Sequence, residues 1–277
     1  MTKISDLSER DVAALDRVRR VASERGLPLV LVGAGARLLR VDWSFGILSP
    51  RTTRDWDFAV EVPDFETYEQ VRQSVADRGT PLKQDTVRVQ VEGVSVDLLP
   101  FGAIESPDGI VRWSSMELDV CGMADAKAGA APLAVTERLV LPVSTIPALA
   151  ALKLIAFEGR GREDDKDLRD FHFIASEYLR CGNEDRLFDE LAAPLAEGTL
   201  PFHRAGPFLL GRDIAHQCSP ETLARVARVL ARIVEDANRH AHTLFGPSFD
   251  DAAERREGEL SELFSAVLEG VASIDAR

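Results

Sequence analysis

Strand-like segments occur only in the first part of the chain, and this uneven distribution is what most constrains the fold. Short, mostly apolar stretches with the length of buried strands lie at Leu29–Val32, Trp56–Val62 and Val94–Leu99. Beyond Cys181 the sequence keeps only helical periodicity, most clearly over Pro220–His240. Strands mixed with helices, followed by helices alone, predict an α/β (α+β) domain over residues 1–180 and a helical domain over residues 181–277.

The other elements follow from apolar spacing and from turn residues. A hairpin is expected where Val87–Val91 and Val94–Leu99 meet at Glu92-Gly93, a pair that suits a tight turn. Pro147 lies where a helix over Ala148–Phe157 begins, as proline often does at the first helical position. The remaining expected elements are helices near residues 5–25, at Phe65–Arg78 and from Asp164 to about Leu179, and a strand around Ala134–Val143.

Two aspartates alternate with aromatic residues along the second expected strand. Successive side chains of a strand point to opposite faces, so Asp55 and Asp57 share one face while Trp56 and Phe58 point into the core. Two neighbouring carboxylates repel each other when both are ionised, and a divalent cation between them removes that cost. Oxygen ligands of this kind suit magnesium, which also binds substrate phosphates.

Asp97 supplies a third candidate ligand. It stands in Val94–Leu99, where Val94, Val96 and Leu98 share a face and Asp97 lies opposite. If this strand lies beside the strand of Asp55, the three carboxylates converge on one metal site. The alternative interpretation is a solvated strand edge with unrelated acids, because Asp-x-Asp alone is common.

A glycine turn follows the first expected strand. Gly33-Ala34-Gly35 separates Leu29–Val32 from a helical pattern over Ala36–Arg40, which gives a strand, a tight turn and a helix. The dinucleotide-binding fingerprint requires a third glycine, and Leu38 stands at that position. Two interpretations remain open: the turn lets the backbone approach phosphates, or it is a tight turn without a ligand.

Composition and missing motifs exclude several classes of protein. A net charge of −13 argues against a chain that coats nucleic acid through overall positive potential. The three cysteines form no CxxC pair, so we expect them to be reduced. No apolar run approaches the roughly 20 residues that cross a bilayer, and a cytoplasmic protein is expected. The sequence also lacks HExxH, Gly-x-Ser-x-Gly and Walker motifs.

Taken together, these residues resemble the nucleotidyltransferase superfamily with the polymerase-β-like fold. The sequence is most similar to the AbiEii/AbiGii-type nucleotidyltransferase toxin family. The resemblance spans about residues 29 to 175 and implies a mixed sheet flanked by helices. Its motifs are Gly33-Ala34-Gly35-Ala36-Arg37, Arg51-x-Thr53-x-Asp55-x-Asp57-Phe58, Val96-Asp97-Leu98-Leu99-Pro100-Phe101-Gly102, and Leu152-Lys153-Leu154 followed by Lys166-Asp167-x-x-Asp170.

The resemblance implies a role for each matched residue. Asp55, Asp57 and Asp97 would bind Mg²⁺, with Mn²⁺ as the alternative, and Asp97 would also favour deprotonation of the attacking hydroxyl. Lys153 would be catalytic and contact the nucleotide phosphates. The remaining residues implied to bind or surround the nucleoside triphosphate are Gly33, Ala34, Gly35, Arg37, Arg51, Thr53, Asp167 and Asp170.

The resemblance also implies the reaction and the partners. A nucleoside monophosphate would move from a nucleoside triphosphate to an acceptor hydroxyl, such as the 3′ end of a tRNA, with release of pyrophosphate. The enzyme would be the toxin of a toxin–antitoxin pair, with an antitoxin protein as partner. The alternatives are transfer to a small molecule or a protein, and an inactive module of the same fold that binds nucleotides.

Considered without the resemblance, the later charged residues have simpler interpretations. Lys153 is flanked by Leu152 and Leu154 on a helix, where it either extends to solvent or reaches into a cleft. Asp167 and Asp170 lie one helical turn apart and are suited to salt bridges. The arginines spaced along the C-terminal helix either meet an RNA backbone or form a solvated face: Arg225, Arg228, Arg232 and Arg239.

Overall fold

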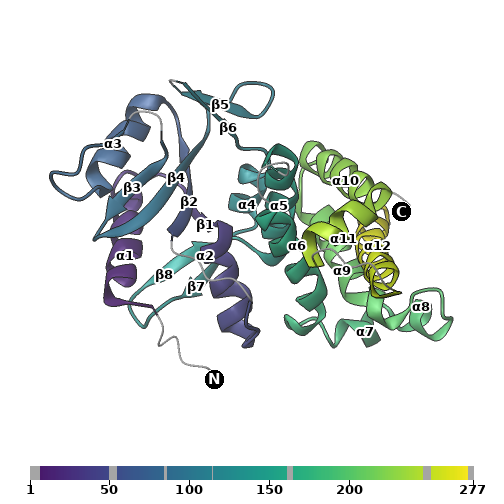
Figure 1. Cartoon of the computed structure of the whole chain (residues 1–277). Coiled ribbons are helices and arrows are strands. Elements are labelled where there is room, and N and C mark those ends of the chain that lie inside the picture. Colours follow the sequence, from purple (N-terminus) through teal and green to yellow (C-terminus); the bar gives the residue numbers. More distant parts are fainter. Residues whose placement is uncertain are drawn as a thin grey trace. The chain divides into compact units, whose positions relative to one another are not determined.

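The fold was analysed in a computed structural model that describes residues 7–49, 55–83, 86–113, 115–160, 165–245 and 251–273. The chain divides into two compact units, Met1–Leu149 and Ala150–Arg277 (Figure 1). The first unit contains the strands and has the expected mixed α/β architecture. The division falls inside one helix, whereas the sequence predicted a domain boundary near residue 180. Division into compact units does not show which residues take part in catalysis. The assignment of residues 150–180 to the catalytic domain therefore stays a prediction.

Six strands of the first unit form one mixed sheet in the order β3-β4-β2-β1-β8-β7. β2 and β4 run parallel at its centre, as do β1 and β8, while the other neighbours are antiparallel. A separate two-stranded hairpin is made by β5 and β6. The strands are β1 (Leu29–Val32), β2 (Asp55–Val62), β3 (Arg88–Val91), β4 (Val94–Gly102), β5 (Ile110–Trp113), β6 (Met116–Asp119), β7 (Ala131–Ala134) and β8 (Val140–Val143).

Helices cover the two faces of this sheet unequally. α1 (Glu9–Glu24) and α3 (Phe65–Val75) pack on the face that carries Trp56 and Leu98. The Trp56 Nε1 atom donates to Asp11 Oδ1 at 2.9 Å, and the buried Tyr68 hydroxyl donates to the Leu98 carbonyl at 2.7 Å. On the opposite face lies α4 (Met123–Ala128), whose Lys127 pairs with Glu61 of β2. α2 (Gly33–Arg37) follows β1 directly and continues into the π-helix η1 (Leu38–Trp43).

The β3–β4 hairpin is formed where the sequence predicts it. Glu92 and Gly93 both have positive φ angles, 53° and 75°, as a tight two-residue hairpin turn requires. The Asp77 carboxylate accepts from the backbone N–H groups of both residues, at 2.7 and 2.9 Å. This anchor fixes the register in which Arg88 faces Asp97.

One prediction about strands was wrong, and one hairpin was not predicted. The strand expected around Ala134–Val143 is instead a hairpin of β7 and β8, because the polar residues between them form a turn in which Val135 N–H donates to the Leu139 carbonyl at 2.8 Å. The β5–β6 hairpin was not predicted. Its strands have only four residues each and alternate weakly, which gives little periodicity to detect.

The second unit is helical, as the sequence predicts for the C-terminal part. α9 and α12 cross closely at two glycines: a Cβ atom at Gly211 would lie 2.0 Å from the Val267 carbonyl oxygen, and one at Gly270 would lie 2.1 Å from that of Phe208. The helices are α5 (Ile146–Arg160, which begins in the first unit), α6 (Lys166–Glu177), the 3₁₀ turn η2 (Tyr178–Arg180), α7 (Arg186–Asp189), α8 (Ala192–Ala196), α9 (Phe202–Gln217), α10 (Pro220–Glu235), α11 (Ala237–Phe245) and α12 (Asp251–Ala272).

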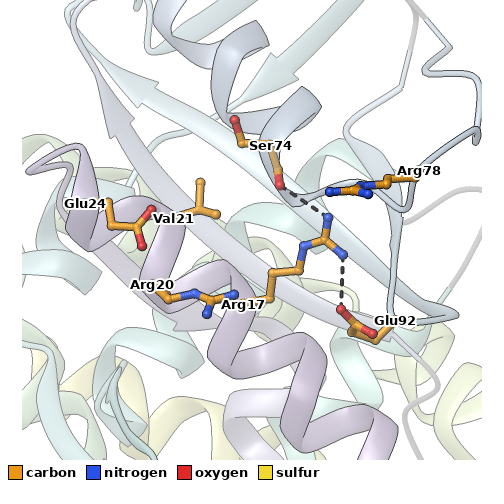
Figure 2. A pocket seen from close by; sticks show the side chains of 7 residues that line it. All are labelled: Arg17, Arg20, Val21, Glu24, Ser74, Arg78 and Glu92. Atoms are coloured by element: carbon orange, nitrogen blue, oxygen red, sulfur yellow. Dashed lines mark hydrogen bonds and ion pairs between the residues drawn. The ribbon is translucent and has the colours of Figure 1, made fainter.

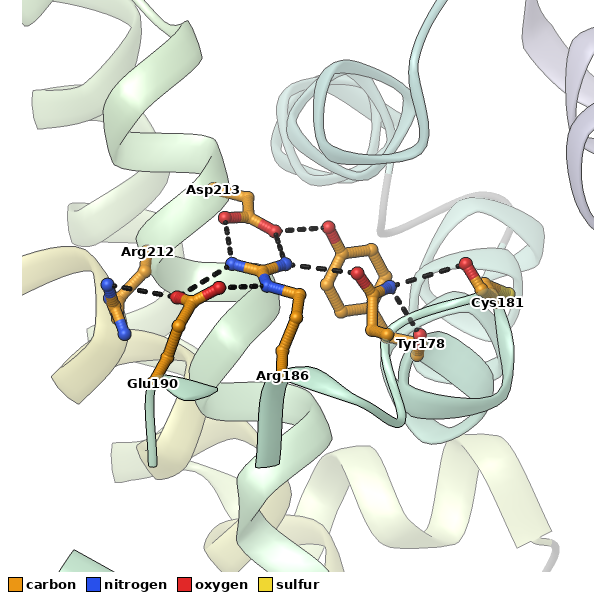
Figure 3. A network of polar contacts seen from close by, with 7 residues as sticks. Tyr178, Cys181, Arg186, Glu190, Arg212 and Asp213 are labelled. Atoms are coloured by element: carbon orange, nitrogen blue, oxygen red, sulfur yellow. Dashed lines mark hydrogen bonds and ion pairs between the residues drawn. The ribbon is translucent and has the colours of Figure 1, made fainter. Parts of the chain in front are cut away.

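A polar network joins η2, α7 and α9 inside this unit (Figure 3). Arg186 makes a forked pair with Asp213, at 2.6 and 2.9 Å, and also pairs with Glu190 at 2.5 Å. The Tyr178 hydroxyl donates to Asp213, and Arg212 lies 3.2 Å from Glu190. Burial and the Asp213 charge raise the pKa of Tyr178, so its hydroxyl remains a donor. The charges are satisfied within the network, which therefore fastens the short helix α7 to α9.

None of the helices that the structure describes is both long enough and apolar enough to span a bilayer.

The half-buried His172 of α6 makes the stability of the second unit depend on pH. Its ring packs edge-on against Phe245, and burial lowers its pKa below the ordinary value of 6.5. The unfolded chain therefore binds more protons than the folded chain as pH falls through about 6.5, and stability decreases there. We expect His172→Gln to reduce this decrease, measured by urea unfolding at pH 7.5 and pH 5.5. An unchanged pH dependence would show that the folded protein accepts the proton freely at this site.

Candidate active site

The three candidate metal ligands come together on one face of the sheet. β2 and β4 are adjacent and parallel, and their register sets Asp57 directly beside Asp97. Asp55 lies two residues before Asp57 on the same face, beside Ser95. The alternating residues Trp56 and Phe58 point to the other face and are buried. The strand pairing on which convergence depends is thus present.

The glycine turn lies against these carboxylates. β1 ends beside Asp57, and Gly33 follows with a φ angle of +66°. A Cβ atom on Gly33 would lie only 2.0 Å from Asp57 Oδ2, so this position requires glycine for its conformation and for space. Glycine is needed at position 35 for a different reason, because a Cβ atom on Gly35 would meet the Trp56 ring at 2.6 Å. Gly33 therefore borders Asp57, whereas Gly35 serves packing, and Ala34 between them is half-buried.

The strain at Gly33 can be tested against a matched glycine. Gly33→Ala is expected to destabilise the protein by about 1–2 kcal/mol through its left-handed backbone and by more through the collision with Asp57. Gly26 has a similar φ angle of +64° with open space around it, so Gly26→Ala carries only the backbone cost. Urea unfolding of both variants separates the cost of the left-handed backbone from the cost of the collision with Asp57. Equal losses of stability would mean that Asp57 moves aside without cost.

Arg37 has a partner inside the protein. Its guanidinium is 1% exposed and pairs with the buried Asp42 at 2.9 Å. Burial raises the pKa of Asp42, while the Arg37 charge and the Ser49 N–H act in the opposite direction. This ion pair gives Arg37 a structural role, and its contact with a nucleotide stays a prediction. Arg51 and Thr53, also predicted to bind nucleotide, lie outside the described residues.

Lys153, Asp167 and Asp170 form a cluster of their own in the second unit. The Lys153 Nζ atom lies 2.9 Å from Asp167 Oδ1 and 2.7 Å from Asp170 Oδ2. All three side chains are buried. Burial alone lowers the pKa of Lys153, but the charges of Asp170 and Asp167 outweigh it and raise that pKa. The structure therefore shows the salt bridges expected for the two aspartates, and Lys153 is the cation that joins them.

Arg88 is a site residue that the sequence analysis missed. It stands on β3 directly opposite Asp97, and its Nε and Nη2 atoms donate to the two Asp97 oxygens at 2.7 and 2.8 Å. The same Nη2 atom donates to Asp55 Oδ2 at 2.7 Å. The predicted turn at Glu92-Gly93 already implied the pairing of Arg88 with Asp97, since residues of a hairpin pair symmetrically about the turn.

The aspartates have the chemistry that a divalent metal needs. Carboxylate oxygens are the ligands that Mg²⁺ prefers, and three of them approach from two adjacent strands. Within the described ranges, however, no three or more histidine, cysteine, aspartate or glutamate side chains are arranged to hold a metal ion. The guanidinium of Arg88 lies between Asp55 and Asp97 instead. The residue types thus suit a divalent cation, whereas their arrangement in this structure holds the guanidinium of Arg88.

A shallow hollow of about 480 Å³ lies elsewhere on the first unit (Figure 2). Its lining comes from α1, from the end of α3 and from the β3–β4 turn, on the face opposite the aspartates. Arg17 spans it, pairing with Glu92 at 3.1 Å and donating to the Ser74 and Ala76 carbonyls. Its lining contains none of the predicted site residues, so the hollow is distinct from the candidate active site.

The arginines of α10 surround a glutamate of α5. Arg225 and Arg232 lie 2.7 and 3.2 Å from Glu158, and Arg228 lies 3.9 Å from it. One carboxylate cannot neutralise three guanidinium groups, and the side chains of Arg228 and Arg232 are more than half exposed. This helix face is therefore both ion-paired and positively charged. Binding of an RNA backbone and a solvated face both remain open as interpretations of these arginines.

Comparison with known proteins gives likenesses in structure alone. No family model matches the chain, and no curated protein matches it in sequence. Several solved structures are similar to it in fold, at low identity.

The solution structure of the antibiotic-resistance factor ANT(2'')-Ia is 14% identical, with a TM-score of 0.38, and the match covers 70% of this chain and 98% of that one. The crystal structure of ANT(2'')-Ia with adenylyl-2''-tobramycin is 17% identical, with a TM-score of 0.36 and coverage of 63% and 97%. A protein of H. pylori proposed to be a nucleotidyltransferase is 14% identical, with a TM-score of 0.38 and coverage of 97% and 99%. Such distant likenesses say nothing of this chain's substrate.

Proposed function

We propose that this protein is a metal-dependent nucleotidyltransferase, which moves a nucleoside monophosphate from a nucleoside triphosphate to an acceptor hydroxyl. One observation carries the proposal: Asp57 and Asp97 lie side by side on neighbouring parallel strands, with Asp55 on the same face and the Gly33 turn against them. A solvated strand edge with unrelated acids does not require a turn that only glycine can occupy.

The reaction would make one phosphorus–oxygen bond and break another. The acceptor oxygen attacks the α-phosphorus of the triphosphate, the bond between the α-phosphorus and the bridging oxygen breaks, and pyrophosphate leaves with the electron pair. Mg²⁺ held by Asp55, Asp57 and Asp97 would neutralise the charge on the triphosphate and favour the departure of pyrophosphate. Asp97 is the residue we assign to the proton of the attacking hydroxyl, because its side chain is only 17% exposed.

The acceptor is the part of the proposal that rests on resemblance. Similarity to the AbiEii/AbiGii-type toxins supports an RNA acceptor, such as the 3′ end of a tRNA, and an antitoxin protein as partner. The exposed arginines of α10 offer positive charge for an RNA backbone, whereas the net charge of −13 opposes RNA binding. If arginines bind RNA, higher salt should weaken acceptor binding steeply. A flat salt response would favour a small molecule or a protein as acceptor.

The test is transfer of labelled nucleotide by the full chain. The protein would be incubated with Mg²⁺, each labelled nucleoside triphosphate in turn and total cellular RNA, alongside the Asp55→Ala/Asp57→Ala double variant. Label that enters RNA with the wild type alone would support both the transferase and the RNA acceptor. Pyrophosphate release with lysate that the double variant lacks, without labelled RNA, would assign the acceptor to proteins or metabolites. Nucleotide binding without either product would overturn the proposal in favour of an inactive binding module.

A further inference from the structure

We propose that Arg88 is a built-in counter-ion of the candidate active site, which occupies the place of the divalent cation and must withdraw before metal binds. This inference rests on the proposed function and adds a control of metal affinity to it. It assigns to Arg88 a positioning role: in the metal-free protein the arginine holds Asp55 and Asp97 together, and it sets how readily a metal replaces it.

The contacts of Arg88 are those of a cation shared by two carboxylates. Three hydrogen bonds of 2.7 to 2.8 Å join its guanidinium to Asp97 and Asp55, and one nitrogen, Nη2, serves both. These carboxylates come from β4 and β2, so the arginine bridges two strands of the sheet. Without a cation, Asp55, Asp57 and Asp97 would gather three negative charges on one face of these strands.

The backbone of Arg88 is fixed while its side chain is free to leave. β3 pairs with β4 along its whole length, and the buried Arg72 donates to the carbonyls of Lys83 and Thr86 at 2.8 Å just before the strand. The Arg88 side chain is 48% exposed, so it can swing into solvent without opening the core. The strand pairing thus sets Arg88 opposite Asp97, and only rotation of its side chain is needed to vacate the carboxylates.

A guanidinium and a divalent metal compete for these carboxylates. Both are cations that draw on the lone pairs of Asp55 and Asp97, and their charges repel at such short range. Metal binding therefore works against the arginine's hydrogen bonds, and this competition lowers the metal affinity of the resting protein. Bound metal together with the phosphates of a substrate would give the displaced guanidinium a new anionic partner.

The test measures metal binding directly, without the reaction. Binding of Mn²⁺ to the full-length protein would be followed by electron paramagnetic resonance for the wild type, Arg88→Gln and Arg88→Lys. We expect Arg88→Gln to bind Mn²⁺ about tenfold more tightly, since two ion pairs no longer oppose it. Arg88→Lys keeps the charge without the fork and should fall between. Arg112 is a matched control, because it is equally exposed, at 48%, and also pairs with two acids, Asp108 and Glu117.

The outcomes distinguish the counter-ion role of Arg88 from the proposed metal-dependent transferase activity. Tighter binding in Arg88→Gln but not in Arg112→Gln, abolished when Asp97→Asn is added, supports this inference. Equal Mn²⁺ affinity in the wild type and Arg88→Gln would overturn it and leave the proposed function standing. Absence of Mn²⁺ binding in both proteins would remove the metal site itself, and the proposed function with it. Thermal unfolding gives a second readout: Mn²⁺ should raise the melting temperature of Arg88→Gln more than that of the wild type.

Discussion

Asparagine in place of Asp57 is expected to lower the rate of nucleotide transfer by at least about 10²- to 10³-fold. Asp57 lies at the meeting point of the site, beside Asp97 on the next strand and against the turn at Gly33. Asparagine has nearly the same size but no charge, so the metal and the triphosphate lose an anionic ligand while the strand keeps its shape. The measurement is the initial rate of pyrophosphate release, with circular dichroism to show that the fold is kept.

Glu61 provides a control on the same strand. It lies on the same face of β2, four residues from Asp57, but its carboxylate pairs with Lys127 at 2.9 Å and is one-third exposed. Glu61→Gln removes the same charge from the same strand, yet we expect less than a twofold change in rate. Similar losses in both variants would mean that general electrostatics, and not metal ligation, explains the effect. Full activity in Asp57→Asn would remove Asp57 from the mechanism.

The sequence defined the strand faces of the site well because they depend on local periodicity. Trp56 and Phe58 are buried and Asp55 and Asp57 share the other face, as alternation along a strand requires. The adjacency of β2 and β4 could be stated only as a condition, since periodicity does not say which strands become neighbours. In the structure that condition is met, and the register of Asp57 with Asp97 follows from it.

Other features depend on packing between distant segments, and the sequence could not determine them. Arg37 carries a charge in a motif expected to bind nucleotide, but its burial with Asp42 is decided by what surrounds the π-helix. Arg88 is different: the predicted hairpin fixed its place opposite Asp97, but a basic side chain is not part of the carboxylate pattern that indicates a metal site. The β7–β8 hairpin was missed because an apolar segment with a polar middle is compatible with one strand or two.

Lys153→Met is expected to destabilise the protein by about 3–5 kcal/mol, the usual cost of removing one partner from a buried ion pair. Its Nζ atom is the cation between Asp167 and Asp170, whose side chains are 2% and 5% exposed. Methionine fills similar space, so the loss reflects the removal of this cation from two buried carboxylates. Urea unfolding measures this loss of stability.

Two further variants show whether Lys153 is structural. Lys127 also pairs with a carboxylate at 2.9 Å, but both side chains are 33% exposed, and Lys127→Met should cost less than about 1 kcal/mol. Adding Asp170→Asn to Lys153→Met should recover part of the stability, because one buried charge disappears with its cation. The resemblance assigns Lys153 to the nucleotide phosphates instead. If Lys153→Met has nearly normal stability but no longer transfers nucleotide, the result would favour phosphate binding by Lys153. If Lys153→Met is strongly destabilised and Asp170→Asn partly restores its stability, the lysine primarily stabilises the second unit.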